Sequence, residues 1–135
     1  MIGLVIITHG HLADELLHAL EHVVGPQEAV RTIAVGPEDR MDDRRDEVIE
    51  AVTALDRGKG VIICTDMFGG TPSNLAIAVI DPGRVEVLTG VNLPMLVKLA
   101  SMRKTESLAE AAASACEAAR KYINVASSLL QDAKS

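Results

Sequence analysis

The feature that most constrains the fold is a nearly continuous run of large apolar residues, most of them β-branched, from Ile2 to Ile7. Its length suits a strand, and its lack of polar residues indicates that both faces of that strand are buried. Strands of this kind are typical of parallel sheets that helices cover on each side. Three further runs have the same character, and they are Val30–Val35, Gly60–Thr65 and Val85–Leu88. We therefore expect four strands.

Amphipathic helices are predicted between these strands. Leu12, Leu16 and Leu20 recur at helical spacing until the pair Gly25-Pro26 ends the pattern. By the same test, further helices are predicted over residues 39–55, 73–80 and 95–102. The alanine-rich sequence from 106 to about 130 predicts one long helix or two helices with a break.

Strands that alternate with helices form a parallel sheet through right-handed crossover connections. The sequence therefore predicts the α/β class, as one three-layer domain over residues 1–135 with a doubly wound, mainly parallel sheet. We expect the strand order 2-1-3-4, and an antiparallel strand could be added at the edge of the sheet.

The charge and the apolar pattern exclude several classes of function. Nineteen acidic residues against 13 basic ones give a net charge of -6, and no run of lysine or arginine occurs, which argues against nucleic-acid binding. No apolar run is long enough to span a membrane, and the first residues lack the pattern of a secretory signal. We expect a cytoplasmic protein.

Reactive residues follow the first and the third predicted strand. In open α/β sheets, ligands bind beyond the carboxyl ends of the strands where the strand order reverses, and these two ends are neighbours in the order 2-1-3-4. His9 follows the first strand and Asp66 the third. A carboxylate that binds one ring nitrogen fixes the tautomer that leaves the other nitrogen free as a nucleophile. We predict His9 and Asp66 as catalytic; the alternative is a histidine that only completes the end of a strand.

The segment after Asp66 has the pattern of an anion site. Gly69 and Gly70 let the backbone come close to a ligand, Thr71 is expected as the N-cap of a helix, and Pro72 suits the first helical position. Ser73 adds a donor in the first turn. Free N–H groups at a helix N-terminus bind anions. The alternative is a tight turn before a capped helix, without a ligand.

Phe68 and the other histidines have both functional and purely structural interpretations. Phe68 lies in a loop, where it would serve as a lid over His9 or as a contact for a partner, or would fold back onto the sheet. His11, His18 and His22 share one polar face of the first helix. His18 and His22 could hold a metal ion, but a structural site needs about four ligands. We favour a solvated face and predict no metal and no cofactor.

Three segments, 8–10, 66–74 and 89–96, occur in an order and at a spacing that together resemble the mannose-family IIA domains of the bacterial phosphotransferase system. The resemblance implies that His9 accepts a phosphoryl group from the phosphohistidine of an HPr-like carrier and gives it to a IIB component. It implies that Asp66 bonds the imidazole and that Thr71 and nearby N–H groups hold the phosphoryl oxygens. Contact with a membrane is then only indirect, through a permease.

The site residues expected on this basis form two groups. The phosphate-binding residues are Thr8, Gly10, Gly69, Gly70, Thr71 and Ser73, and the partner-binding residues are Phe68 and Asn92. The family is also dimeric, with a C-terminal strand that can cross to the partner subunit, so a homodimer is implied. His11 departs from the family pattern and would add a titrating group near the site.

The sequence leaves other functions open. It contains no IIB segment, so we expect the phosphoryl acceptor to be a separate chain. The main alternative is a permease-independent regulatory phosphoprotein, in which the phosphorylation state of His9 controls a partner protein. A nucleotide-binding module is a further alternative, but neither of the glycine motifs typical of such modules, GxGxxG and GxxxxGK(S/T), occurs at these positions. The phosphotransfer subunits of dihydroxyacetone kinases have a similar fold and histidine, but segment 66–74 resembles the mannose family better.

Overall fold

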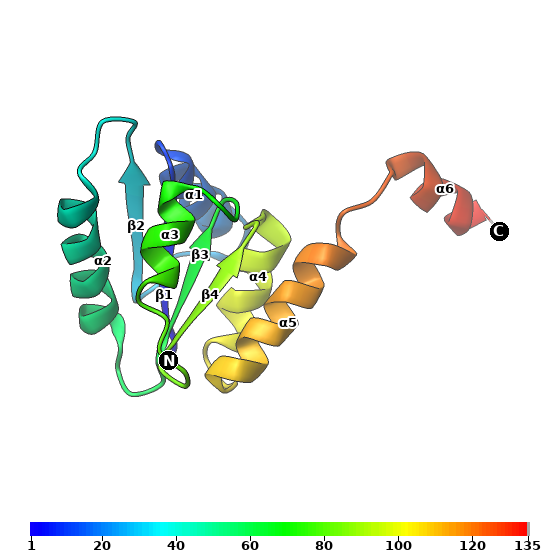
Figure 1. The fold of residues 1–135 in the computed structure, drawn as a ribbon. Helices are drawn as coiled ribbons and strands as arrows, with labels where there is room; N and C mark the ends of the chain where they lie inside the picture. The colour runs from blue at the N-terminus through cyan, green and yellow to red at the C-terminus, as the bar shows by residue number, and fades with distance from the viewer. Residues whose placement is uncertain (135) are drawn as a thin grey trace.

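Four parallel strands form one sheet in the order β2-β1-β3-β4 in the computed structural model, which describes residues 1–134 and their side chains as far as Gln131 (Figure 1). The strands are β1 (Gly3–His9), β2 (Val30–Val35), β3 (Val61–Thr65) and β4 (Val85–Thr89). The register places His9 opposite Val35, and Ile7 opposite Thr65. The carboxyl ends of β1 and β3 therefore lie side by side, and the predicted fold class and strand order are confirmed.

Helices cover both faces of this sheet. They are α1 (Leu12–Val24), α2 (Met41–Leu55), α3 (Thr71–Ile77), α4 (Leu93–Met102) and α5 (Leu108–Lys121), and a further helix, α6 (Ala126–Lys134), follows α5 in the chain. α1, α4 and α5 pack on one face, and α2 and α3 pack on the other. No helix within residues 1–134 is both long and apolar enough to cross a membrane.

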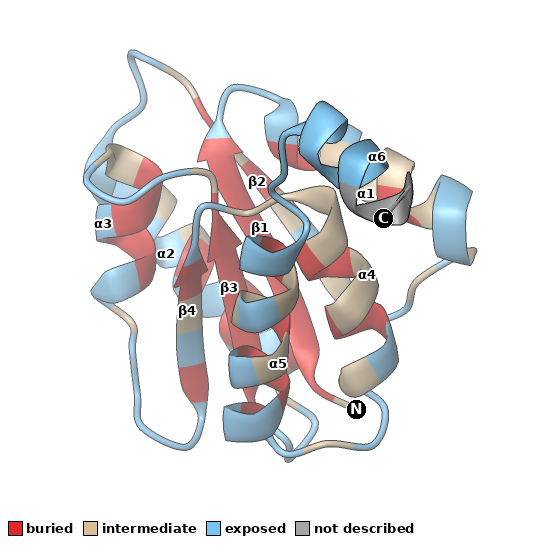
Figure 2. Cartoon of the chain, turned by 90° about the vertical axis from the view of Figure 1, so that its right-hand side faces the viewer, coloured by how far each residue is buried: buried red, intermediate tan, exposed pale blue. Residues whose placement is uncertain are grey.

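The core is built from alternating residues of the central strands. Ile6 of β1 joins the cluster under α1, α4 and α5, whereas Val5 and Ile7 join the cluster under α2 and α3. Successive side chains of a strand point to opposite faces, so both faces of β1 must be apolar. Figure 2 shows β1 and β3 buried along nearly their whole length, and β4 partly exposed. The apolar runs thus become the middle of the sheet.

The structure corrects two predictions about elements. α3 begins at Thr71 with Gly70 as its N-cap residue, so Thr71 is the first helical residue and Pro72 the second, because Gly70 already has an extended backbone. No antiparallel edge strand occurs within residues 1–134, where the antiparallel contact is one isolated bridge between Asp81 and Val85.

The C-terminal segment forms two helices with a break, which is one of the two arrangements that the sequence predicted. α5 ends at Lys121 and α6 begins at Ala126. In Figure 1, α6 stands away from the helices and the sheet. Ile123 and Val125 between the two helices are 73% and 69% exposed. This part of the chain therefore carries apolar surface that its own domain does not bury.

A buried arginine lies at the amino ends of β1 and β2, at the end of the sheet opposite to His9. Arg103 follows α4 directly and is almost fully buried. Its side chain donates hydrogen bonds to the carbonyl oxygens of Ile2, at 2.9 Å, and of Ala29, at 2.7 Å. Burial lowers the pKa of Arg103 to about 10, so the guanidinium remains charged at neutral pH. It links α4 to the starts of β1 and β2.

Candidate functional site

His9 and Asp66 meet at the carboxyl edge of the sheet. His9 is the last residue of β1, and Asp66 follows the last residue of β3. The ring Nδ1 of His9 lies 2.8 Å from Oδ2 of Asp66, and the backbone N–H of His9 donates to the same oxygen at 3.0 Å. The other carboxylate oxygen accepts from the backbone N–H of Met67 at 3.0 Å. The predicted pair is therefore formed, and each oxygen of its carboxylate accepts at least one hydrogen bond.

The state of the carboxylate determines which ring nitrogen of His9 is free. Burial tends to raise the pKa of Asp66, but hydrogen bonds from His9 and from the N–H of Met67 outweigh it and hold that pKa below its ordinary value. An ionised carboxylate can only accept, so Nδ1 carries the ring proton and Nε2 keeps its lone pair. The His9 side chain is 52% exposed and that of Asp66 is 14% exposed. Nε2 is thus a nucleophile that an incoming group can reach.

A glycine packs directly against this nitrogen. A Cβ atom placed on Gly70 would lie 2.7 Å from Cε1 and 2.9 Å from Nε2 of His9, which leaves room for no side chain. Helix α3 begins at the next residue, Thr71. The first N–H groups of a helix have no partner within it, so that of Thr71 is available, whereas Pro72 has none and Ser73 is fully buried. Backbone donors therefore lie close to the reactive nitrogen.

Thr8 and Gly10 have a different role from the predicted one. The hydroxyl of Thr8 is buried, accepts from the backbone N–H of Ala13 at 2.7 Å and donates to the carbonyl oxygen of Gly10 at 3.3 Å. The N–H of Gly10 donates to the carbonyl oxygen of Val35 at 2.8 Å, and its φ of 56° is left-handed. Both groups already have partners within the domain, so they shape the turn that carries His9 and leave these donors unavailable to a phosphate.

Ser73 also differs from the prediction, and Asn92 has contacts within the domain. Ser73 is fully buried, and its hydroxyl has no hydrogen-bond partner among the described residues, so neither its side chain nor its backbone is exposed to an incoming anion. The side chain of Asn92 accepts from the N–H of Met95 and donates to the carbonyl oxygen of Ala119, each at 3.0 Å. Asn92 therefore caps α4 and ties it to α5, and its predicted contact with a partner stays a prediction.

The comparisons with known proteins identify the family. A family model described as "PTS system fructose IIA component" matches residues 3–116. The chain belongs to this family. The mannose-specific EIIAB component of Escherichia coli (strain K12) is 37% identical over 124 residues, which cover 90% of this chain and 38% of that protein. This IIA chain thus spans less than half the length of that curated relative.

Other relatives agree with this assignment. The sorbose-specific EIIA component of Lacticaseibacillus casei is 30% identical over 100 residues, or 72% of this chain and 70% of that protein. The solved structure of component EIIA from Streptococcus agalactiae superposes with a TM-score of 0.86 at 28% identity, covering 95% of this chain and 99% of that one. At this level, the chain is a member of the family of IIA components of the phosphotransferase system.

An exposed apolar rim lies beside the histidine of this IIA domain. Phe68 is 71% exposed and Met67 is 58% exposed, so Phe68 is not folded back onto the sheet. Its role as a lid or as a partner contact stays a prediction. Sequence reasoning missed Met67, whose N–H fixes Asp66 and whose side chain enlarges the rim; the only signal was its place directly after the carboxylate.

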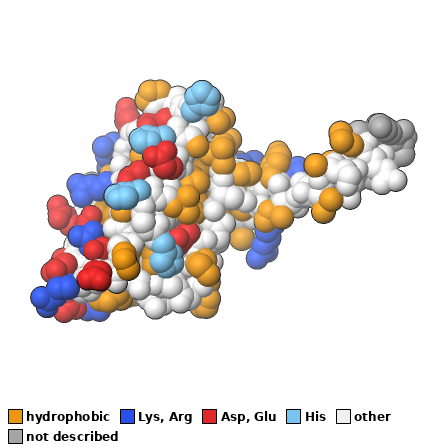
Figure 3. Space-filling model, turned by 90° about the horizontal axis from the view of Figure 1, so that it is seen from above, with side chains coloured by type: hydrophobic (Ala, Val, Ile, Leu, Met, Phe, Trp, Pro, Cys, Tyr) orange, Lys and Arg blue, Asp and Glu red, His pale blue; other side chains and the backbone are white. Residues whose placement is uncertain are grey.

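Two of the remaining histidines, His11 and His18, lie close to acidic residues of α1. His11 is the N-cap residue of α1 and lies just outside the helical face that we predicted for it. Its Nδ1 lies 3.1 Å from Oδ2 of Asp14, whose other oxygen accepts from the hydroxyl of Thr32. His18 lies 3.6 Å from Glu15. Figure 3 shows histidines and acidic side chains together on the face seen from above.

Proposed function

We propose that this IIA domain is a phosphocarrier of the sugar phosphotransferase system. In this proposal Nε2 of His9 takes a phosphoryl group from the phosphohistidine of an HPr-like carrier and later gives it to a IIB component. The observation that carries the proposal is the contact of 2.8 Å between Nδ1 of His9 and Asp66, which leaves Nε2 as the free ring nitrogen beside Gly70.

Each transfer exchanges one P–N bond for another. The bond between phosphorus and the nitrogen of the donor histidine breaks as a bond from phosphorus to Nε2 of His9 forms. The proton on Nδ1 stays in place because Asp66 accepts it in a hydrogen bond, and Asp66 balances the positive charge that develops on the ring. Such a reaction depends mainly on position and on charge stabilisation, and it needs no metal or cofactor from this domain.

The phosphoryl oxygens are expected to bind at the start of α3. The hydroxyl of Thr71 and the backbone N–H groups of residues 69–71 supply donors there, next to the glycine that packs against the ring. Phe68 and Met67 present apolar surface at the rim, which suits the docking of a carrier protein. Because these carriers work in the cytoplasm, we place the protein there as well.

A homodimer is the second part of the proposal. Ile123 and Val125 are 73% and 69% exposed, and β4 is the outer strand of the sheet. An extended segment that adds to an open strand edge pairs its backbone and buries its apolar side chains. Ile123→Asp should therefore turn a dimer into a monomer in analytical ultracentrifugation, with Ser127→Asp as the control. A wild-type protein that sediments as a monomer would contradict this part.

Phosphorylation from labelled phosphoenolpyruvate with enzyme I and HPr tests the phosphocarrier. We expect label on the wild-type chain and on His18→Ala, which removes an exposed histidine elsewhere, and none on His9→Ala. Label retained by His9→Ala would overturn the assignment. Chase of the label into purified IIB components tests the second transfer, and a phosphorylated chain that releases label to none of them would contradict the IIB step.

A further inference from the structure

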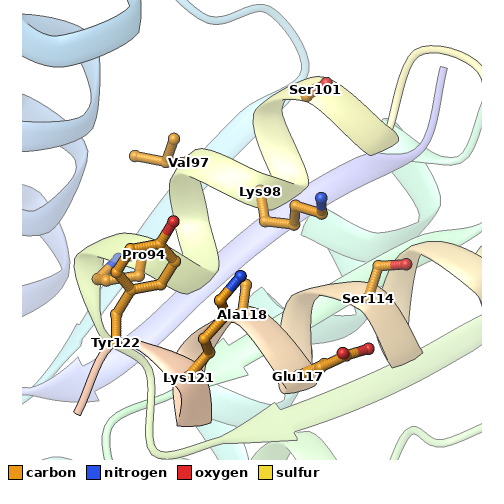
Figure 4. Close-up of a pocket in the computed structure, with 9 residues that line it drawn as sticks. All are labelled: Pro94, Val97, Lys98, Ser101, Ser114, Glu117, Ala118, Lys121 and Tyr122. Atoms are coloured by element: carbon orange, nitrogen blue, oxygen red, sulfur yellow. The ribbon is translucent and has the colours of Figure 1, made fainter. Parts of the chain in front are cut away.

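A groove of about 410 Å³ lies between α4 and α5, apart from the histidine site (Figure 4). It exists because the two helices present small side chains where they meet: Ser101 on α4, and Ser114 and Ala118 on α5. Pro94 and the ring of Tyr122 close one end. This volume is within the range of small-molecule sites.

Two ammonium groups share this groove. Lys98 of α4 and Lys121 of α5 both line it, and Figure 4 shows their side chains extending between the helices. Lys98 is half-buried, so its stem packs against the helices while its charge remains at the groove. Within the described residues, neither ammonium lies within 4.0 Å of a carboxylate, although Glu117 lines the same groove. The two lysines and one glutamate that line the groove thus leave it an excess of one positive charge.

The rest of the chain shows how unusual this charge is. Residues 1–92 contain 15 acidic and 7 basic residues, whereas residues 93–135 contain 4 acidic and 6 basic ones. Several of the basic residues in the first part lie within 4.0 Å of a carboxylate, namely Arg31, Arg44, Arg45 and Arg84. The two lysines of the groove are therefore a basic feature of an acidic protein, and an anionic ligand would balance their positive charge.

We propose that this groove binds a small organic phosphate with a hydroxyl-rich body, of the sugar phosphate class. The two ammonium groups hold the phosphate, as point charges that need no fixed angle. The hydroxyls of Ser101, Ser114 and Tyr122 are donors and acceptors for the sugar hydroxyls, and the face of the Tyr122 ring covers the body of the ligand. The site is separate from His9 and does not depend on its phosphorylation.

Titration of the isotope-labelled protein, followed by two-dimensional NMR, tests this proposal. Glucose 6-phosphate should give saturable shifts in amides of α4 and α5, glucose should give none, and inorganic phosphate should give weaker ones. The double variant Lys98→Gln/Lys121→Gln should weaken binding by about tenfold or more, since two charged contacts are lost. Lys59→Gln, at an exposed lysine elsewhere, should leave binding unchanged.

A variant that fills the groove separates a formed site from general attraction to positive charge. Ser114→Leu keeps both lysines but places a larger side chain between the helices, and it should abolish the shifts while the protein stays folded. Three results would overturn the proposal: no saturable shift with glucose 6-phosphate, equal binding by wild type and the double lysine variant, or shifts centred on His9 and Thr71. The last result would assign the anion to the phosphoryl site.

Discussion

Two histidine–carboxylate pairs lie within a few residues of each other, and only one of them has the surroundings of a reaction site. His9 and Asp66 come from two strands and are 57 residues apart in the sequence, and their side chains are 52% and 14% exposed. His11 and Asp14 belong to the same turn of chain and are 83% and 40% exposed. Both pairs join Nδ1 to a carboxylate, so the pairing alone does not distinguish them.

The difference lies in what surrounds the other ring nitrogen. Gly70 touches Nε2 of His9, and helix α3 begins immediately after it. His11 instead precedes a first helical turn that contains Asp14 and Glu15, whose negative charges would repel a phosphoryl group. The comparison teaches that an oriented imidazole needs a nearby set of donors before it becomes a phosphoryl acceptor.

The largest expected effect comes from replacing each histidine in turn. His9→Gln should abolish phosphorylation by phospho-HPr, because no ring nitrogen remains at the site. His11→Gln should change the rate by about threefold or less, the scale of one exposed charge. Initial rates with labelled phosphate measure both. Similar losses in the two variants would mean that the pairs are not different in function.

The next effect tests the space beside the ring. Gly70→Ala should slow phosphorylation by about 100-fold, because its methyl group would displace the imidazole or occupy the place of the phosphoryl group. The φ of Gly70 is -106°, which alanine accepts, so the thermal midpoint should stay near that of wild type. Labelling reactions stopped at several times measure the rate of phosphorylation, and thermal unfolding followed by circular dichroism measures the midpoint. A normal rate would show that the donors of α3 are not used.

A smaller effect is expected from the two carboxylates. Asp66→Ala should slow transfer by about tenfold or more, since the ring loses its orientation and its fixed tautomer. Asp14→Ala removes the matching partner of His11 and should leave the rate of transfer unchanged. The same labelling assay compares them. If Asp66→Ala transfers at the wild-type rate, Asp66 has no part in the mechanism.

The smallest effect concerns stability against pH, where the two pairs should behave alike. The pKa of Asp66 is held below its ordinary value of about 3.9 by hydrogen bonds that outweigh burial. The folded state therefore binds fewer protons than the unfolded state as the pH falls below about 4, and stability declines there. The stability lost in Asp66→Asn should be largest near neutral pH and should shrink as the pH falls through the folded pKa. Urea unfolding at several pH values measures it.

Asp14 supplies the control for this last experiment. Its pKa is also lowered, first by the hydrogen bond from Thr32 and then by that from His11. Asp14→Asn should therefore show the same direction of change with pH. A loss of stability in Asp66→Asn that grows as the pH falls would mean that the carboxylate does not stabilise the folded state in its ionised form.

Much of the fold could be predicted because apolar runs and helical stripes are local patterns. Ile2–Ile7 predicted β1 nearly to its ends, and Val30–Val35 matches β2. Boundaries that depend on backbone conformation were less accurate: α3 begins earlier than predicted, with Gly70 in place of Thr71 as N-cap. The break between α5 and α6 was left open because helix propensity is high on both sides of it.

The sequence by itself determined the alternation of strands and helices and the position of His9 and Asp66 at the carboxyl ends of two neighbouring strands, because both strands are apolar on both faces. Only the tertiary structure decided which polar groups remain free. Thr8, Gly10 and Asn92 have the right chemistry for ligands, yet hydrogen bonds within the domain already occupy the Thr8 hydroxyl, the Gly10 N–H and one N–H of the Asn92 amide. Hydrogen bonds between segments that are distant in the sequence depend on how the chain packs, and local patterns of residue type and spacing do not reveal that packing.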